Sequence, residues 1–287
     1  MSNMKKIYLL IVAGFFFISI EAQSNRFISK SQLVDFFTST TYVVMDNNPS
    51  VGFNIFIKDA MQKYWKVTPY KIVSYDEFDK MRKDNKNSFL FLSVENLTKG
   101  NTEAFYDFLV LAMGDTSTIL SNMPEIVNIP LSYSGVDENE YVNKLGLIVR
   151  FIEGHVQNMK EASNHVYLRK LNYYNKYLKD VKTKTLLVED EDLAEEVNTI
   201  EKIKAIYKYD VKIVTSDEIE KAVEEKTPNT LVLHQISPGA EDTEGRSYHY
   251  ILGTDDAKMY YFNFFTISGK KPTGFLAKDF RRLAMGI

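Results

Sequence analysis

The chain contains no cysteine among its 287 residues. This absence excludes disulfides, thiol nucleophiles and cysteine-ligated metals, so the fold must be held by packing. Excess charge is also lacking: the net charge of −3 argues against a nucleic-acid partner or a polybasic membrane surface. Only seven prolines interrupt the sequence, and 45% of the residues are hydrophobic, so the chain can bury one large core or two smaller ones.

The amino terminus has the layout of a secretory signal peptide. Lys5 and Lys6 precede an apolar or small-residue run from Ile7 to Ile20, which is followed by small and polar residues around Ala22. This run is shorter than the roughly 18 residues of a spanning helix, and no later run is long and apolar enough to span a membrane. We therefore expect residues 1–22 to be removed. Because the chain has no cysteine to carry a lipid, we expect a soluble periplasmic or extracellular protein and not a lipoprotein.

An internal repeat is the most informative pattern. Residues 71–93 align without a gap with residues 212–234. The identical pairs are Lys71/Lys212, Ile72/Ile213, Val73/Val214, Asp76/Asp217, Glu77/Glu218, Lys80/Lys221, Leu90/Leu231 and Leu92/Leu233. Repeats of this kind indicate a duplicated structural unit. The ungapped alignment predicts that the apolar pairs occupy equivalent buried positions.

The surroundings of the two segments also correspond. Each has a short apolar strand and an amphipathic helical pattern upstream, then a strand, a capping box, a short helix and consecutive strands without a helix between them. The capping boxes begin at Ser74 and Thr215. We expect an α/β fold with two tandem related units, 23–162 and 163–287, each a mixed sheet with flanking helices and antiparallel hairpins. The long apolar stripe after Asp137 predicts one helix reaching Ala162.

The segment YWKVTPYKIVSYDEF, which begins at Tyr64, resembles a YWK-TPY motif of uncharacterised secreted proteins from Bacteroidetes. The resemblance implies an exported protein but brings no assigned activity, cofactor or site residue. The order of strand, helix, strand and hairpin also resembles the amino-terminal domain of the Tol-Pal system's propeller protein. That likeness concerns topology alone, which carries no function.

Four residues are candidates for a ligand-binding site. His234 ends a predicted strand, and Glu241 and Asp242 lie in the following loop, so the three could converge at one end of a sheet. Trp65 could stack on a sugar or peptide, although a large ring at helical spacing more often packs in a core. The remaining histidines, His155, His165 and His249, show no spacing typical of a metal site or a nucleophile motif.

The acidic run 189–192 follows a predicted strand. It lacks the alternating ligands and central glycine of a calcium loop, so we interpret it as a solvated stretch at a helix start. Neither a catalytic constellation nor a cofactor or metal motif is recognisable. The first hypothesis is a non-catalytic binding protein with a macromolecular partner in the cell envelope. The alternatives are a small-ligand binder that uses a cleft between the halves and a carboxylate-dependent hydrolase.

Overall fold

The computed structural model describes residues 27–97, 103–117, 119–162, 168, 170–238, 244–268 and 273–287. The predicted signal peptide therefore lies outside the described residues. The chain separates into two compact units. Of the described residues, those up to Met45 belong to the smaller unit with Thr68–Phe91 and Val110–Asn128, and those within Asp46–Val67, Leu92–Leu109 and Ile129–Ile287 belong to the larger unit.

The first sheet has the strand order β2-β1-β3-β4-β5. Its strands are β1 (Thr41–Val44), β2 (Tyr70–Val73), β3 (Ser88–Asn96), β4 (Phe105–Met113) and β5 (Glu125–Tyr133). β1 pairs in parallel with both β2 and β3. Two helices of the smaller unit, α2 (Lys30–Phe36) and α4 (Tyr75–Met81), begin with capping boxes at Ser29 and Ser74, as the sequence predicts for Ser74.

Buried hydroxyl groups hold the amino ends of β1 and β3 together. Thr41 Oγ1 lies 2.6 Å from Thr68 Oγ1 and 2.8 Å from Ser88 Oγ, which lies 2.8 Å from Ser39 Oγ. All four side chains are buried. Because each hydroxyl can both donate and accept, this neutral cluster satisfies itself without solvent.

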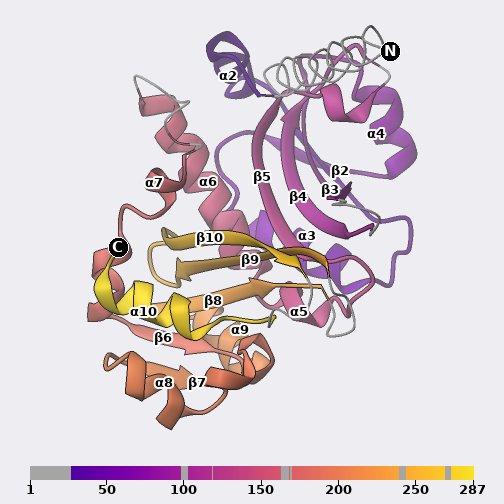
Figure 1. Ribbon diagram of the computed structural model, residues 1–287. Helices are drawn as coiled ribbons and strands as arrows, with labels where there is room; N and C mark the ends of the chain where they lie inside the picture. Colours follow the sequence, from indigo (N-terminus) through magenta and orange to yellow (C-terminus); the bar gives the residue numbers. More distant parts are fainter. Residues whose placement is uncertain are drawn as a thin grey trace, which may run out of the picture. The chain divides into compact units, whose positions relative to one another are not determined.

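The second sheet belongs entirely to the larger unit and has the order β10-β9-β8-β6-β7 (Figure 1). Its strands are β6 (Thr185–Val188), β7 (Val211–Ile213), β8 (Thr230–Ile236), β9 (Glu244–Gly253) and β10 (Met259–Ser268). β6 pairs in parallel with β7 and β8, whereas β9 is antiparallel to β8 and β10. Read from its other end, this order is that of the first sheet. The predicted α/β class with two mixed sheets is confirmed.

Helices and short 3₁₀ turns flank the strands of the larger unit. The α-helices are α3 (Gly52–Tyr64), α5 (Asn139–Val142), α6 (Leu145–Glu161), α7 (Leu171–Tyr174), α8 (Ile200–Ile206), α9 (Ser216–Glu224) and α10 (Ala277–Met285). The 3₁₀ turns are η3 (Leu178–Thr183), η4 (Asp190–Asp192) and η5 (Glu195–Val197), and the smaller unit has η1 (Leu120–Asn122). The helix expected from Asp137 to Ala162 is divided between α5 and α6. Lys144 is the residue before α6, and its side chain makes no capping hydrogen bond to the start of that helix.

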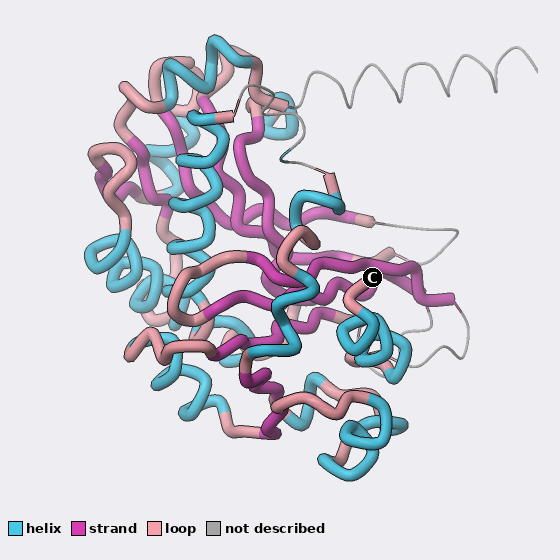
Figure 2. Tube along the Cα trace, turned by 90° about the vertical axis from the view of Figure 1, so that its left-hand side faces the viewer, coloured by secondary structure: helices cyan, strands magenta, loops and turns pink. Residues whose placement is uncertain are grey.

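One face of the second sheet is covered by α10, α8 and η3, and α10 contacts both of the others. The apolar strand residues on this face include Leu186 of β6, Leu231 of β8 and Ile251 of β9. They belong to one core cluster with Phe280 and Leu283 of α10, and all five are fully buried. Figure 2 shows α10 beside the marked C-terminus, outside the layer of strands. This covered face carries the apolar core. It also carries a group of polar side chains, described below, that includes Ser247 and His249 of β9.

The repeat is real in topology, but its register differs from the ungapped alignment. Thr41 N donates to Pro69 O, and Leu186 N donates equivalently to Asp210 O, so Thr41 corresponds to Leu186. Thr41 pairs with Ser88, whereas Leu186 pairs with Leu231. The cause is a two-residue difference in helix length, because α4 has seven residues and α9 has nine.

The predicted pairing of Leu90 with Leu231 is therefore wrong. Leu90 corresponds to Leu233, and both are buried. The expectation that Ile72 is buried is also wrong, because it lies on edge strand β2 and is 45% exposed.

Candidate functional site

A cavity of about 440 Å³ lies at the carboxyl ends of β6, β7 and β8. Its wall includes Asp192 and Leu193 after β6, Ser216 after β7, and Gln235 and Ser237 at the end of β8. Residues between 136 and 144 and between 273 and 274 complete it. Ligands of open α/β sheets bind outside the carboxyl ends of the strands, so this position is the expected one for a binding site. We call it the acidic cavity.

A buried ion pair lies at the wall of the acidic cavity. Lys144 Nζ is 2.5 Å from Glu189 Oε2 and 3.8 Å from Asp192 Oδ2, and these three residues are each less than a tenth exposed. Burial alone would lower the pKa of Lys144, but the charges of Asp192 and Glu189 outweigh it and raise that pKa. Lys144 is therefore a charged ammonium group inside the protein.

Among the described residues around the acidic cavity, carboxylates outnumber this cation. Burial raises the pKa of Asp192 to about 7, and repulsion from Glu189 and Glu191 adds to the effect, whereas Lys144 opposes it. Loss of water at the wall, followed by the charge of Glu191, also raises the pKa of Glu140. Asp192 Oδ2 accepts no hydrogen bond from the described residues. Another positive charge in the cavity would relieve this crowding.

A chain of polar contacts leads from the cavity wall into the covered face of the sheet. Ser237 Oγ accepts a hydrogen bond from Gln235 Nε2 and lies 2.7 Å from Ser247 Oγ. Ser247 Oγ lies 2.8 Å from His249 Nε2, and His249 Nδ1 lies 3.3 Å from Asp279 Oδ2. Ser237 is half-buried, whereas the last three residues have no exposed surface. The antiparallel register of β8 and β9 places Gln235 opposite His249.

Asp279, at the inner end of these polar contacts, has two roles. Its Oδ2 accepts from Leu276 N at 3.1 Å, which caps α10, and its Oδ1 accepts from Tyr261 Oη at 2.7 Å. Burial would raise the pKa of Asp279, but the contacts with His249, Tyr261 and the Leu276 amide lower it below its usual value. Asp279 is therefore an ionised carboxylate facing the His249 ring.

A short extended segment before α10 forms another part of the wall. Phe275 N donates to Asp192 O at 2.7 Å, and Ala194 N donates to Phe275 O at 3.1 Å. Gly274 has a φ of +88°, and a Cβ there would lie 2.7 Å from Ala194 N. Only glycine fits this backbone conformation and this close approach, so the local sequence fixes the segment against the acidic loop.

The structure places two of the four predicted site residues. His234 is buried on β8, and its Nε2 lies 2.7 Å from Leu131 O. Burial, helped by the charge of Lys144, lowers the pKa of His234 to about 3, so its ring is neutral near pH 7. Trp65 follows α3 and is 5% exposed. Glu241 and Asp242 lie outside the described residues.

Sequence reasoning missed the residues that do come together. The acidic run was expected to be solvated, but Glu189 and Asp192 are buried against Lys144, which is distant in sequence. His249 was counted with the structural histidines, and its serine and aspartate neighbours come from β9 and α10. His155 is buried beside Phe151, and His165 lies outside the described residues. The only available signal was the alternation of Ser247 and His249, which puts both on one face of a strand.

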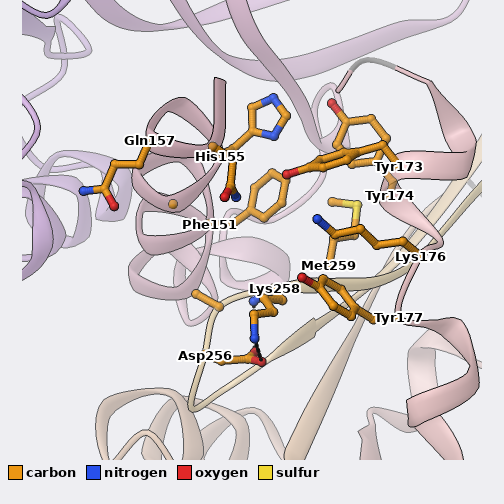
Figure 3. Close-up of a pocket in the computed structure, with 13 residues that line it drawn as sticks. Phe151, His155, Gln157, Tyr173, Tyr174, Lys176, Tyr177, Asp256, Lys258 and Met259 are labelled. Carbon is orange, nitrogen blue, oxygen red and sulfur yellow. Dashed lines mark hydrogen bonds and ion pairs between the residues drawn. The ribbon is translucent and has the colours of Figure 1, made fainter. Parts of the chain in front are cut away.

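A second cavity, of about 210 Å³, has a different lining (Figure 3). Aromatic rings of α6 and α7 face the β9–β10 turn across it, and the labelled residues include Phe151, His155, Tyr173, Tyr174, Tyr177 and Met259. Lys176 Nζ lies 4.1 Å from the centroid of Tyr173, and Lys258 Nζ lies 3.2 Å from Asp256 Oδ2. Both lysines are thus engaged by rings or a carboxylate.

No family model, no curated protein and no solved structure matches the chain. Within the described ranges, no group of three or more His, Asp or Glu residues has the arrangement of a metal site. Among the same residues, no helix is both long and apolar enough to cross a membrane.

Proposed function

We propose that the protein binds a small ligand with a guanidinium or ammonium group in the acidic cavity. This corresponds to the small-ligand alternative from the sequence, because the cavity is lined by residues from both sequence halves. The observation that carries the proposal is the crowding of Glu140, Glu189, Glu191 and Asp192 around one ammonium, Lys144. A ligand cation would meet Glu140 and Asp192, whose pKa values are raised by burial and then by neighbouring carboxylates.

Polar wall groups would orient such a ligand. Ser216, Gln235 and Ser237 present hydroxyl or amide groups to the cavity, next to the carboxylates. Ligand sites commonly combine a concave surface with a few placed polar groups of this kind. We also propose export, on the signal-peptide pattern alone; amino-terminal sequencing of the exported protein is expected to begin near Gln23.

The binding experiment compares two ligands of matched shape. Calorimetric titration at pH 8 with N-butylguanidinium should give a Kd of about 1 mM or tighter, within the range for a fragment of this size. N-butylurea, which is similar in shape but neutral, should bind at least tenfold more weakly. Equal affinity for the two compounds contradicts the proposal.

Surface variants locate the binding. Glu191 is exposed at the cavity wall, so Glu191→Gln should leave folding intact and weaken N-butylguanidinium binding by about 3- to 10-fold. Glu225 is an exposed acid outside the cavity lining and provides the matched control. Glu225→Gln should bind like the unmodified protein. If both variants weaken binding alike, the cation binds through general surface charge.

A further inference from the structure

We propose that Ser237 is an acyl-accepting nucleophile, activated through Ser247 by the His249–Asp279 pair, and that the acidic cavity cleaves esters whose acyl part carries a cation. The cationic preference rests on the proposed function above, whereas the nucleophile rests on a separate set of contacts. Those contacts are two hydrogen bonds of 2.7 and 2.8 Å from the cavity wall to His249, and an approach of His249 Nδ1 to 3.3 Å from a buried carboxylate that lacks hydrogen-bond geometry.

The positions of the hydrogen atoms along this path are inferred from its inner end, the Asp279 carboxylate. Asp279 is ionised and already accepts from Tyr261 and the Leu276 amide. A bare nitrogen lone pair facing that carboxylate at 3.3 Å would be repelled, so His249 Nδ1 carries the proton. The proposal needs the Nε2 lone pair as the base, so Nε2 accepts and Ser247 is the donor to His249.

The same argument continues to the cavity. Ser247 has given its only hydrogen to His249, so at the 2.7 Å contact Ser237 donates and Ser247 accepts. Gln235 Nε2, which can only donate, lies beside both hydroxyls: it donates to Ser237 Oγ and lies 3.4 Å from Ser247 Oγ. The hydroxyls of Ser237 and Ser247 therefore both donate toward His249, as removal of the Ser237 proton during attack requires.

The surroundings suit a base of this kind. His249 is fully buried between Phe265 and Phe275, with ring centroids at 5.3 and 5.2 Å, so water cannot compete for Nε2. The ionised Asp279 offsets the positive charge that His249 acquires. A purely structural role as the cap of α10 would require only Asp279. It would not explain why His249, Ser247 and Ser237 follow one another in line with this carboxylate.

The reaction balances with water as the only co-reactant. Ser237 Oγ bonds to the ester carbonyl carbon while its proton passes to Ser247, whose own proton passes to His249 Nε2. The carbon–oxygen bond to the alcohol then breaks, and the proton returns through Ser247 to the departing alcohol oxygen. Water, deprotonated along the same path, releases the acid and restores Ser237.

The test uses a fluorophosphonate probe, which bonds to an activated serine oxygen with loss of fluoride. The full chain should be labelled once, at Ser237 by peptide mass spectrometry, and Ser237→Ala should abolish labelling. Ser247→Ala should slow labelling at least tenfold, because it interrupts the path while changing little volume. Ser216 lines the same cavity but is linked to no histidine, so Ser216→Ala should be labelled at the normal rate.

The outcomes separate the two proposals. Circular dichroism and thermal unfolding check that each variant is folded; the conservative Ser247→Thr, which retains a hydroxyl, should recover part of the rate. Absence of labelling, labelling that persists in folded Ser237→Ala, or an undiminished labelling rate in folded Ser247→Ala overturns the nucleophile whatever the result of ligand titration. Labelling at Ser237 that N-butylguanidinium does not slow supports the nucleophile and counts against the cationic preference.

Discussion

The two sheets share one topology but place their buried polar groups at opposite ends of the parallel strands. In the first sheet the neutral hydroxyl cluster around Thr41 and Ser88 lies at the amino ends. The equivalent positions in the second sheet are Leu186 and Leu231, both fully buried. The second sheet instead gathers charged groups, including Lys144, at the carboxyl ends.

This difference shows that a repeated topology does not by itself repeat a site. A neutral cluster satisfies its own hydrogen bonds and stabilises the packing of strands. Buried charges of unequal number leave an electrostatic demand that a ligand can meet. The two sheets also differ at the position of His234, because the corresponding buried residue of the first sheet is Phe91.

The largest expected effect comes from removing the buried cation. Lys144→Ala leaves Glu189 and Asp192 buried without a counter-charge, so the free energy of unfolding at pH 8 should fall by about 3–5 kcal/mol. Urea denaturation measures this. Lys63, whose pair with Asp59 is about half exposed, is the control, and Lys63→Ala should cost about 0.5 kcal/mol or less. Similar losses of unfolding free energy in both variants would show that Lys144 does not form a buried ion pair with Glu189 and Asp192.

The corrected repeat register predicts a matched pair of core truncations. Leu90 and Leu233 occupy corresponding buried positions, so Leu90→Ala and Leu233→Ala should each lower the free energy of unfolding by about 2–5 kcal/mol. Ile72→Ala, on the exposed edge strand, should cost well under half as much. A large loss at Ile72 would mean that this side chain is buried, as the repeat alone predicted.

His234 should make the protein sensitive to acid. Its pKa is about 3 when folded and 6.5 ordinarily, so between these values the unfolded chain binds the proton more readily. Stability therefore falls as the pH falls from 6.5, by at most about 3 kcal/mol at pH 4 from this residue. His234→Asn should flatten the measured decline in unfolding free energy over that range. An unchanged slope would mean that His234 is not the neutral buried ring proposed.

The smallest effect is expected in the hydroxyl cluster. Thr41→Val keeps the shape of the side chain but removes a hydroxyl shared with Thr68 and Ser88, at a cost of about 1–2 kcal/mol in unfolding free energy. The exposed Thr38 also bonds a backbone oxygen, and Thr38→Val should change stability by less than about 0.5 kcal/mol. A neutral result at Thr41 would mean that the cluster adds nothing to strand packing.

Local patterns predicted the fold better than the site. The capping boxes at Ser74 and Thr215 and the strand alternation depend on residues close in sequence, and the structure has these elements. The two-residue insertion in α9 was invisible because chance identities at Leu231 and Leu233 favoured the ungapped alignment. Local periodicity does not reveal such a shift.

The site could not be read from the sequence because its members meet only through tertiary structure. Lys144 lies before α6, whereas Glu189 follows β6, and no local spacing links them. His249 and Asp279 likewise meet only when α10 packs on the sheet. An acidic run without its buried partner has the pattern of a solvated loop.

Calorimetric titration of N-butylguanidinium at pH 7, in two buffers of different ionisation enthalpy, tests the central claim most directly. Because the pKa of Asp192 is about 7, roughly half of the protein molecules carry a proton on this carboxyl before binding. A bound cation lowers that pKa. We predict the net release of a fraction of a proton and an affinity that rises as the pH increases through 7. Asp192→Asn should abolish the release. Binding with no proton release, or release that is unchanged in folded Asp192→Asn, would contradict the assignment of the acidic cavity as a cation site.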